Sequence, residues 1–210
     1  MTALPTPAQR DAESAWAEEL GRLASLVAHE VNNLLNGVAV NLEVVRSRAA
    51  RNAESSTVAP FAETASAQLE LLTPVIRAMI TLAKPAHNAI SLTAELANIV
   101  SVLGVVAAAK GGQISVDRPD SRTDTGVSGA AARLILASAL RLAAEPGVYV
   151  QVGITTQGQE TVVRLARPGN SGVQVPHAVA ETAAAAGVQL EHVADALLIR
   201  FPAGPLPLTP

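Results

Sequence analysis

Apolar residues recur along the first fifty positions of the chain in steps of four and three. At about 100° of rotation per residue, this spacing aligns them in one stripe along a single helix. The stripe consists of Trp16, Leu20, Leu23, Val27, Val31, Leu34, Val38, Leu42, Val45 and Ala49. We therefore predict a long helix from about Ala8 to about Arg51 whose apolar stripe is buried by other parts of the protein.

A second helical pattern follows after a short break. Segment 51–60 is rich in residues that form turns and cap helices, and it predicts a loop. A second helix is predicted from about Pro60 to Ala83, with Pro74 inside it, where the missing N–H should produce a kink. Its apolar positions are Phe61, Ala65, Leu69, Leu72, Ile76, Met79, Ile80 and Ala83.

The two helices predict a hairpin whose combined apolar face is too long for the hairpin itself to bury. The simplest solution is a second copy of the chain, which gives an antiparallel four-helix bundle around a two-fold axis. A homodimer is therefore expected. The alternative is that the second half of the same chain covers this face.

The pattern changes after about residue 87, where shorter helices alternate with strands. The predicted elements are helix 92–110, strand 113–117, helix 128–145, strands 148–154 and 161–165, helix 175–186, and strands 188–192 and 197–201. This order predicts an α+β sandwich of helices on one sheet. The expected organisation is a helical hairpin over 1–86, this α/β domain over 87–203 and a tail over 204–210.

The composition of the chain excludes several classes of protein and of partner. Of the 210 residues 49% are apolar, so the chain can build a core, but only 2% are aromatic. The net charge of −3 without a basic cluster argues against nucleic acid as a partner. The absence of cysteine excludes disulfides and thiolate metal sites. With neither an uninterrupted apolar span nor a signal peptide, we expect no membrane association and a cytoplasmic location.

His29 lies on the side of the first helix away from the apolar stripe, roughly 200° from Val27. The same outward half carries Asn32, Asn33 and Asn36, with Glu30 at its border. A surface histidine alone is weak evidence of function. An imidazole held in water beside a carboxylate nevertheless stays a nucleophile that another protein can reach.

The segment from His29 to Val38 reads His-Glu-Val-Asn-Asn-Leu-Leu-Asn-Gly-Val. It resembles the phosphoacceptor box of sensor histidine kinases, His-Glu-hydrophobe-Asn-Asn-Pro-Leu-Asn-x-hydrophobe, and departs from it at Leu34, where that box usually has proline. The order of elements in the second half is similar to that of the ATP-binding domain of the same superfamily. The resemblance therefore covers nearly the whole chain, by motif around His29 and by layout elsewhere.

The residues with which that family binds Mg-ATP are missing from this sequence. The helix expected over 128–145 has no asparagine to help hold magnesium. Arg167 stands near the place of an aspartate that binds adenine, and a guanidinium has no acceptor for an amine. Gly169 and Gly172 alone are typical of a turn, and only about six residues connect Gly169 to Val175, too few for a nucleotide lid. We expect no bound ATP.

The resemblance then implies a dimeric histidine phosphotransfer protein, which relays phosphoryl groups between the aspartates of receiver domains of response regulators. His29 would be the nucleophile, Glu30 would hydrogen-bond the imidazole or accept its proton, and Asn33 would orient the phosphoryl group or a water. No cofactor is expected, because the receiver would bring its own Mg²⁺.

Two alternatives stay open. One is an autokinase with a divergent ATP site, and the other is a non-catalytic dimeric adaptor that docks response regulators. The remaining histidines, His87, His177 and His192, lack metal-ligand spacing and are expected to be structural.

Overall fold

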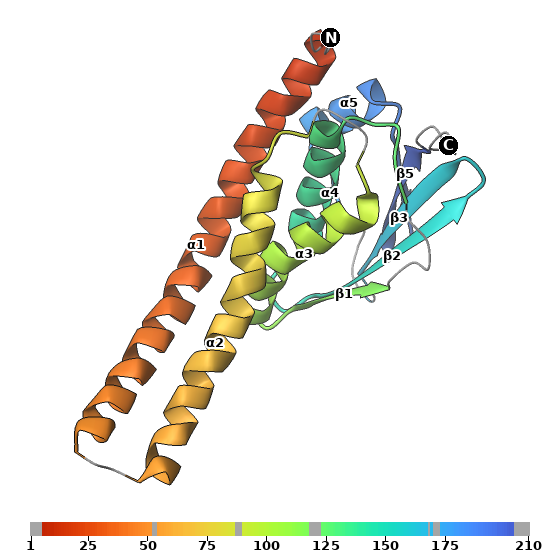
Figure 1. The fold of residues 1–210 in the computed structure, drawn as a ribbon. Coiled ribbons are helices and arrows are strands. Elements are labelled where there is room, and N and C mark those ends of the chain that lie inside the picture. Colours follow the sequence, from red (N-terminus) through yellow and green to blue (C-terminus); the bar gives the residue numbers. More distant parts are fainter. Residues whose placement is uncertain are drawn as a thin grey trace, which may run out of the picture.

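The computed structural model of the protein describes residues 6–51, 54–86, 90–117, 123–167, 169 and 173–203. The elements are α1 (Pro7–Ala50), α2 (Ser55–Leu82), α3 (Leu92–Ala109), β1 (Gln113–Asp117), α4 (Gly129–Ala143), β2 (Tyr149–Gln157), β3 (Glu160–Ala166), α5 (His177–Ala185), β4 (Gln189–Val193) and β5 (Ala196–Pro202). The predicted fold class is confirmed: a long helical hairpin precedes an α+β sandwich, and the order of elements matches the prediction (Figure 1).

The ends of the elements follow from local chemistry. Thr6 and Gln9 form a capping box at the start of α1, and the Ser128 side chain caps α4. Gly158 has a φ of 61° in the turn between β2 and β3, a conformation that glycine adopts without steric cost.

The start of α2 differs from the prediction. The helix begins at Ser55, five residues before Pro60, and Pro60 lies inside it. Segment 51–60 is therefore not a loop throughout. A serine-rich start is compatible with a first helical turn, since the first four N–H groups need no helical partner. The proline then removes only a single backbone hydrogen bond.

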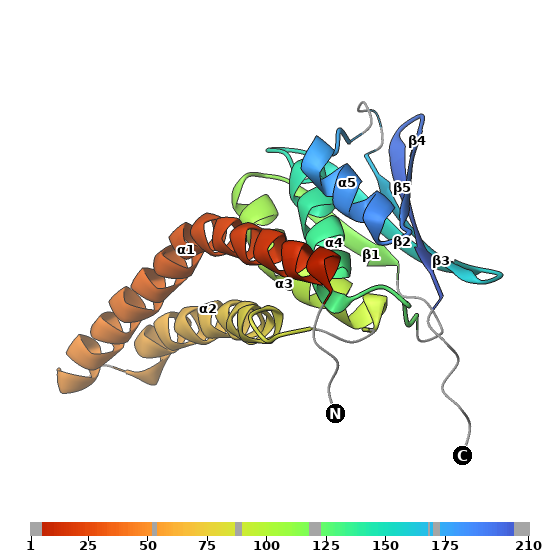
Figure 2. The same ribbon diagram turned by 90° about the horizontal axis from the view of Figure 1, so that it is seen from above.

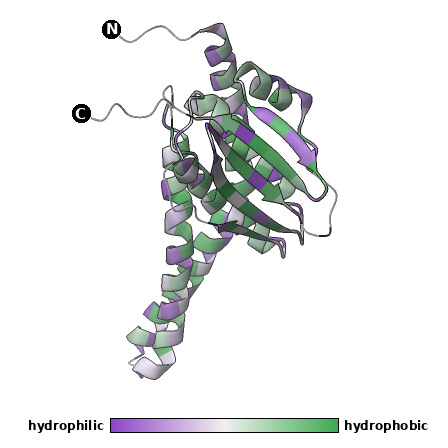
Figure 3. Cartoon of the chain, turned by 90° about the vertical axis from the view of Figure 1, so that its right-hand side faces the viewer, coloured by the Kyte–Doolittle hydropathy of each residue, from purple (hydrophilic) through white to green (hydrophobic). Residues whose placement is uncertain are grey.

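The sheet has the strand order β1-β2-β3-β5-β4, with β1 parallel to β2 and all other neighbours antiparallel. Helices α3, α4 and α5 cover one face of the sheet, as the view from above shows (Figure 2). The other face carries a mixture of polar and apolar residues and is not covered by helices (Figure 3).

The N-terminal half of α1 and the C-terminal half of α2 pack on the helical layer of the α/β domain (residues 87–203; Figure 1). One cluster of buried residues crosses the expected boundary at residue 86. It includes Leu23 and Val27 of α1, Leu82 of α2 and Ile135 of α4. The hairpin and the α/β domain thus share one core. Their division into separate domains stays a prediction.

This packing corrects part of the expectation for the apolar stripe. Leu23 and Val27 were expected to be buried across a two-fold axis, but the single chain already buries them. The alternative, in which the second half of the chain covers the stripe, therefore holds for the N-terminal half of α1. Val31 still packs against this core. The end of the hairpin that holds the loop between α1 and α2 extends away from the α/β domain (Figure 1).

Helix α3 has the length and apolar composition of a membrane span, the one such helix in the described part of the chain. Of its 18 residues 44% are buried, and it contacts α1, α2, α4 and β1. Its contacts are those of a core helix.

Candidate functional site

His29 lies on α1 between Val27, which is part of the buried core, and Val31, which packs against that core. Its side chain is exposed, as its angle to the apolar stripe predicted, and it has no hydrogen bond or ion pair with any residue that the structure describes. Val27, two residues earlier, is 4% exposed. The helix is therefore anchored by one face while the imidazole on the opposite face meets solvent.

The side chains of Glu30 and Asn33 hydrogen-bond each other, and neither forms a hydrogen bond with His29. The Asn33 side-chain amide donates a hydrogen bond to Glu30 Oε2 over 3.4 Å. The expected hydrogen bond from Glu30 to the imidazole is not formed in this structure. Glu30 and Asn33 instead lie about one helical turn apart on α1, and their hydrogen bond restrains the Glu30 carboxylate next to His29.

The exposed large apolar residues of the hairpin fall into two groups. Leu35 and Leu42 on α1 are seven residues apart, and Leu69, Ile76 and Ile80 on α2 follow at steps of seven and four, so each set is one stripe. Viewed along each helix from its N-terminus, the stripe points roughly 110° away from the buried face of that helix. The sense of this rotation is the same for both helices. Since the helices are antiparallel, both stripes lie on the same side of the hairpin.

Val40 and Leu71 make the second group, with exposures of 64% and 59%. Helical geometry places both on the opposite side of the hairpin, the side of His29. Val40 follows His29 by three helical turns, and Leu71 lies on the neighbouring helix α2. His29 thus lies on a surface that offers both a nucleophile and apolar contacts to a partner protein.

The region where the histidine kinase family binds nucleotide is closely packed here. Every residue of α4 from Gly129 to Leu140 is buried, including Ser138. Arg167, near the place where the resemblance expects an aspartate, is 5% exposed and forms an ion pair of 2.7 Å with Glu145 after the end of α4. Pro168 and residues 170–172, with the second glycine of the predicted turn, lie outside the described residues.

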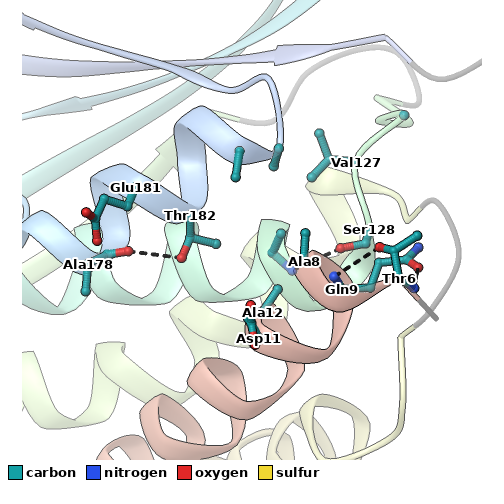
Figure 4. Close-up of a pocket in the computed structure, with 14 residues that line it drawn as sticks. Thr6, Ala8, Gln9, Asp11, Ala12, Val127, Ser128, Ala178, Glu181 and Thr182 are labelled. Atoms are coloured by element: carbon teal, nitrogen blue, oxygen red, sulfur yellow. Dashed lines mark hydrogen bonds between the residues drawn. The ribbon is translucent and has the colours of Figure 1, made fainter.

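Figure 4 shows a cavity of about 510 Å³ at the other end of α4, between the starts of α1 and α4 and one side of α5. The Thr182 hydroxyl donates to the Ala178 carbonyl over 3.0 Å, and Ser128 and Thr6 cap helices. The hydroxyl groups lining the cavity therefore already have partners within the protein, and nothing assigns it a ligand.

The other histidines form no site. Exposed His177 pairs with Glu181 over 3.2 Å, His192 is exposed on β4, and His87 lies outside the described residues. No three His, Asp or Glu side chains of the described chain are placed to hold a metal ion.

Buried charged residues were missed by the sequence analysis. Glu19 is fully buried, and Glu95 and Arg133 are 7% and 4% exposed. Each stands at an apolar position of an otherwise apolar helical stripe. A charge at such a position was the available signal, because it requires a partner within the core.

No protein family model and no curated protein sequence matches this chain. The chain is similar to several solved structures. A blue-light-activated histidine kinase of Erythrobacter litoralis is 16% identical over 87% of this chain, with a TM-score of 0.43, and the match spans 63% of the kinase. A histidine kinase of Acinetobacter baumannii is 9% identical over 84% of this chain and 98% of its own, with a TM-score of 0.45. A structure described as a bacterial phosphotransferase is 15% identical over 88% and 96%, with a TM-score of 0.39.

Proposed function

We propose that this protein is a histidine phosphotransfer protein of a two-component phosphorelay, with His29 as the phosphoacceptor. The observation that carries the proposal is the exposed imidazole on a helix whose opposite face is anchored in the core. The motif from His29 to Val38, which resembles a phosphoacceptor box, supports the same role.

The reaction balances without a cofactor from this chain. A ring nitrogen of His29 attacks the phosphorus of an aspartyl phosphate on a docked receiver domain, so that an N–P bond forms while the P–O bond to the aspartate breaks. The aspartate carboxylate is the leaving group, and the proton on the other ring nitrogen passes to Glu30 or to water. The receiver supplies Mg²⁺, which neutralises charge on the phosphoryl oxygens. Transfer to a second receiver reverses these steps.

The packing of α4 supports phosphotransfer over autophosphorylation. A nucleotide needs a cavity with polar groups, and the central part of α4 is buried on every side by protein. Arg167 is engaged by Glu145 and has no acceptor for the adenine amino group.

The two groups of exposed apolar residues support the proposed partners. We assign the stripes of Leu35, Leu42, Leu69, Ile76 and Ile80 to a homodimer that forms a four-helix bundle. The opposite side, with Val40 and Leu71, is left for receiver domains to dock at His29. Both partners then bind the same hairpin without competing for one surface.

The test is the transfer of labelled phosphoryl group from phosphorylated receiver domains. We expect an acid-labile, base-stable phosphohistidine on the wild-type protein and none on His29→Gln, whose fold should be intact because His29 contributes nothing to packing. His192→Gln, a second exposed histidine, is the control and should accept label normally.

The same assay separates the alternatives. Label that persists on His29→Gln contradicts the proposal. Receiver binding without transfer would indicate an adaptor. Label from Mg-ATP alone would indicate an autokinase, and Mg-ATP should then raise the melting temperature, since a ligand at a hundred times its Kd stabilises a fold by about 2.7 kcal/mol.

A further inference from the structure

Arg133 of α4 joins three helices at the point where the hairpin meets the α/β domain. Its guanidinium donates to both carboxylate oxygens of Glu95 on α3, each over 2.9 Å. It also donates to three carbonyl oxygens at the C-terminal end of α2, those of Thr81 (3.4 Å), Leu82 (3.2 Å) and Lys84 (2.6 Å). Carbonyls at a helix end lack helical partners, so this arginine of one domain caps a helix of the other.

A second arginine ties the other helix of the hairpin. The fully buried Glu19 of α1 accepts hydrogen bonds from Arg141 of α4 over 2.6 and 3.4 Å. Arg22 adds a third contact to the same carboxylate over 3.0 Å. Separating α1 from α4 would leave this carboxylate without its partner from α4, or would require its hydration in a newly opened core.

Between the two ties lies apolar contact and one more hydrogen bond. The Trp16 indole N–H donates to the Leu82 carbonyl over 3.3 Å, and Leu23 and Leu82 are fully buried. A cavity of about 250 Å³ is lined jointly by Leu26 and the ends of α3 and α4, so the α/β domain reaches to within three residues of His29 along α1.

We infer that two contacts lock the α/β domain in one position against the hairpin, namely the hydrogen bonds from Arg133 to the carbonyls at the end of α2 and the pair of Arg141 with the buried Glu19. The domain then forms a fixed surface next to His29. An enzyme that phosphorylates its own histidine must carry a bound nucleotide to the imidazole, and a locked domain does not make that movement. The inference goes beyond the proposed function, because phosphotransfer between receivers places no demand on the mobility of this domain.

The experiment measures the distance between hairpin and sheet by pulsed electron paramagnetic resonance. The chain has no cysteine, so Ser66→Cys on α2 and Thr155→Cys on β2, both exposed, accept one spin label each. Dilution with unlabelled protein removes distances between copies. We expect one narrow distance distribution, unchanged after phosphorylation of His29 and after addition of a receiver domain.

The variant Glu19→Gln/Arg141→Gln removes both charges of one tie, so it leaves no buried charge alone. We expect its distance distribution to be at least twice as wide as that of the wild type. Glu43→Gln/Arg46→Gln removes an exposed pair of the same helix, with a contact of 2.9 Å, and should keep the wild-type width.

A broad or two-peaked distribution in the wild type overturns the lock, and so does a distribution that stays narrow in the untied variant. If that variant fails to fold, the wild-type distribution decides the question by itself. The two proposals can fail separately. A broad distance distribution with normal phosphoryl transfer to His29 would overturn only the lock. A narrow distance distribution without phosphoryl transfer would overturn only the proposed function.

Discussion

At the scale of single residues, the side chains that we propose for phosphotransfer and those that pack in the core lie on different faces of α1. His29, Asn33 and Val40 are exposed along one face, whereas Trp16, Glu19 and Leu23 are buried along the other. A substitution on the exposed face should therefore change transfer and leave the free energy of unfolding nearly unchanged.

Glu30→Gln tests this separation. The amide keeps the size of the side chain but cannot accept a proton, and we expect phosphoryl transfer to His29 to slow by on the order of 100-fold. The loss of an exposed contact of 3.4 Å to Asn33 should cost less than about 1 kcal/mol. Rapid-quench transfer assays and urea unfolding measure the two effects. Glu43→Gln is the matched control on the same helix, and an unchanged rate in Glu30→Gln would remove Glu30 from the proposed mechanism.

Single residues also mark the limit of prediction from the sequence. The exposure of His29 followed from its angle to the apolar stripe. The partners of Glu19 and Arg133 did not, because they lie 122 and 38 residues away in the chain, and only the packed fold brings them together.

At the scale of elements, α1 and α2 are fitted to each other by a glycine. A Cβ at Gly37 would lie 2.2 Å from the side-chain Nε2 of Gln68, so the missing side chain makes room for that amide. The Asn41 amide donates to the Gly37 carbonyl over 2.8 Å in the same region. The Gln68 side chain of α2 therefore occupies the space beside Gly37 of α1.

Gly37→Ala therefore should depend on the residue at position 68. In a Gln68→Ala background we expect the alanine to stabilise the protein by about 1 kcal/mol, the usual gain over glycine inside a helix. With Gln68 present the gain should vanish, since the amide must leave its place. Denaturant unfolding of the four variants gives the coupling. Gly21→Ala, with open space at its Cβ, should give the same gain in both backgrounds; equal gains at Gly37 would contradict the close fit.

Elements were predicted well wherever a stripe or a turn residue marked them. All ten helices and strands of the described residues were expected. The start of α2 was misplaced because a proline is compatible both with a first turn and with a position further inside a helix that already has partners to pack on.

At the scale of the whole molecule, the sequence could not show which surface covers which part of the long stripe. Periodicity identifies an apolar face but not its neighbour, and a second copy and the second half of the chain both satisfy it. The structure buries Leu23, Val27 and Val38 of the stripe within the single chain, and Leu42 stays exposed. We assign Leu42, with the other exposed apolar residues on its side of the hairpin, to the proposed dimer.

The proposed dimer is tested by Ile76→Glu/Ile80→Glu. These residues are 44% and 58% exposed in the single chain, so the charges should prevent association while the fold persists. Light scattering at micromolar concentration should show a dimeric wild type and a monomeric variant, each with the same circular dichroism spectrum.

Leu71→Glu is the matched control on the opposite side of the hairpin. It should stay dimeric and should slow transfer from receiver domains, because it places a charge on the proposed docking surface. A monomeric wild type would contradict the dimer, and normal transfer by Leu71→Glu would contradict the assignment of the docking side.

The cap that Arg133 supplies to α2 also has a consequence for synthesis on the ribosome. The arginine is made 51 residues after Leu82, whose carbonyl it binds, so the end of α2 emerges roughly three to ten seconds before its cap at usual rates of translation. During that interval Trp16, Leu23 and Leu82 have no α4 to cover them. The hairpin therefore completes its folding only when α4 has been made.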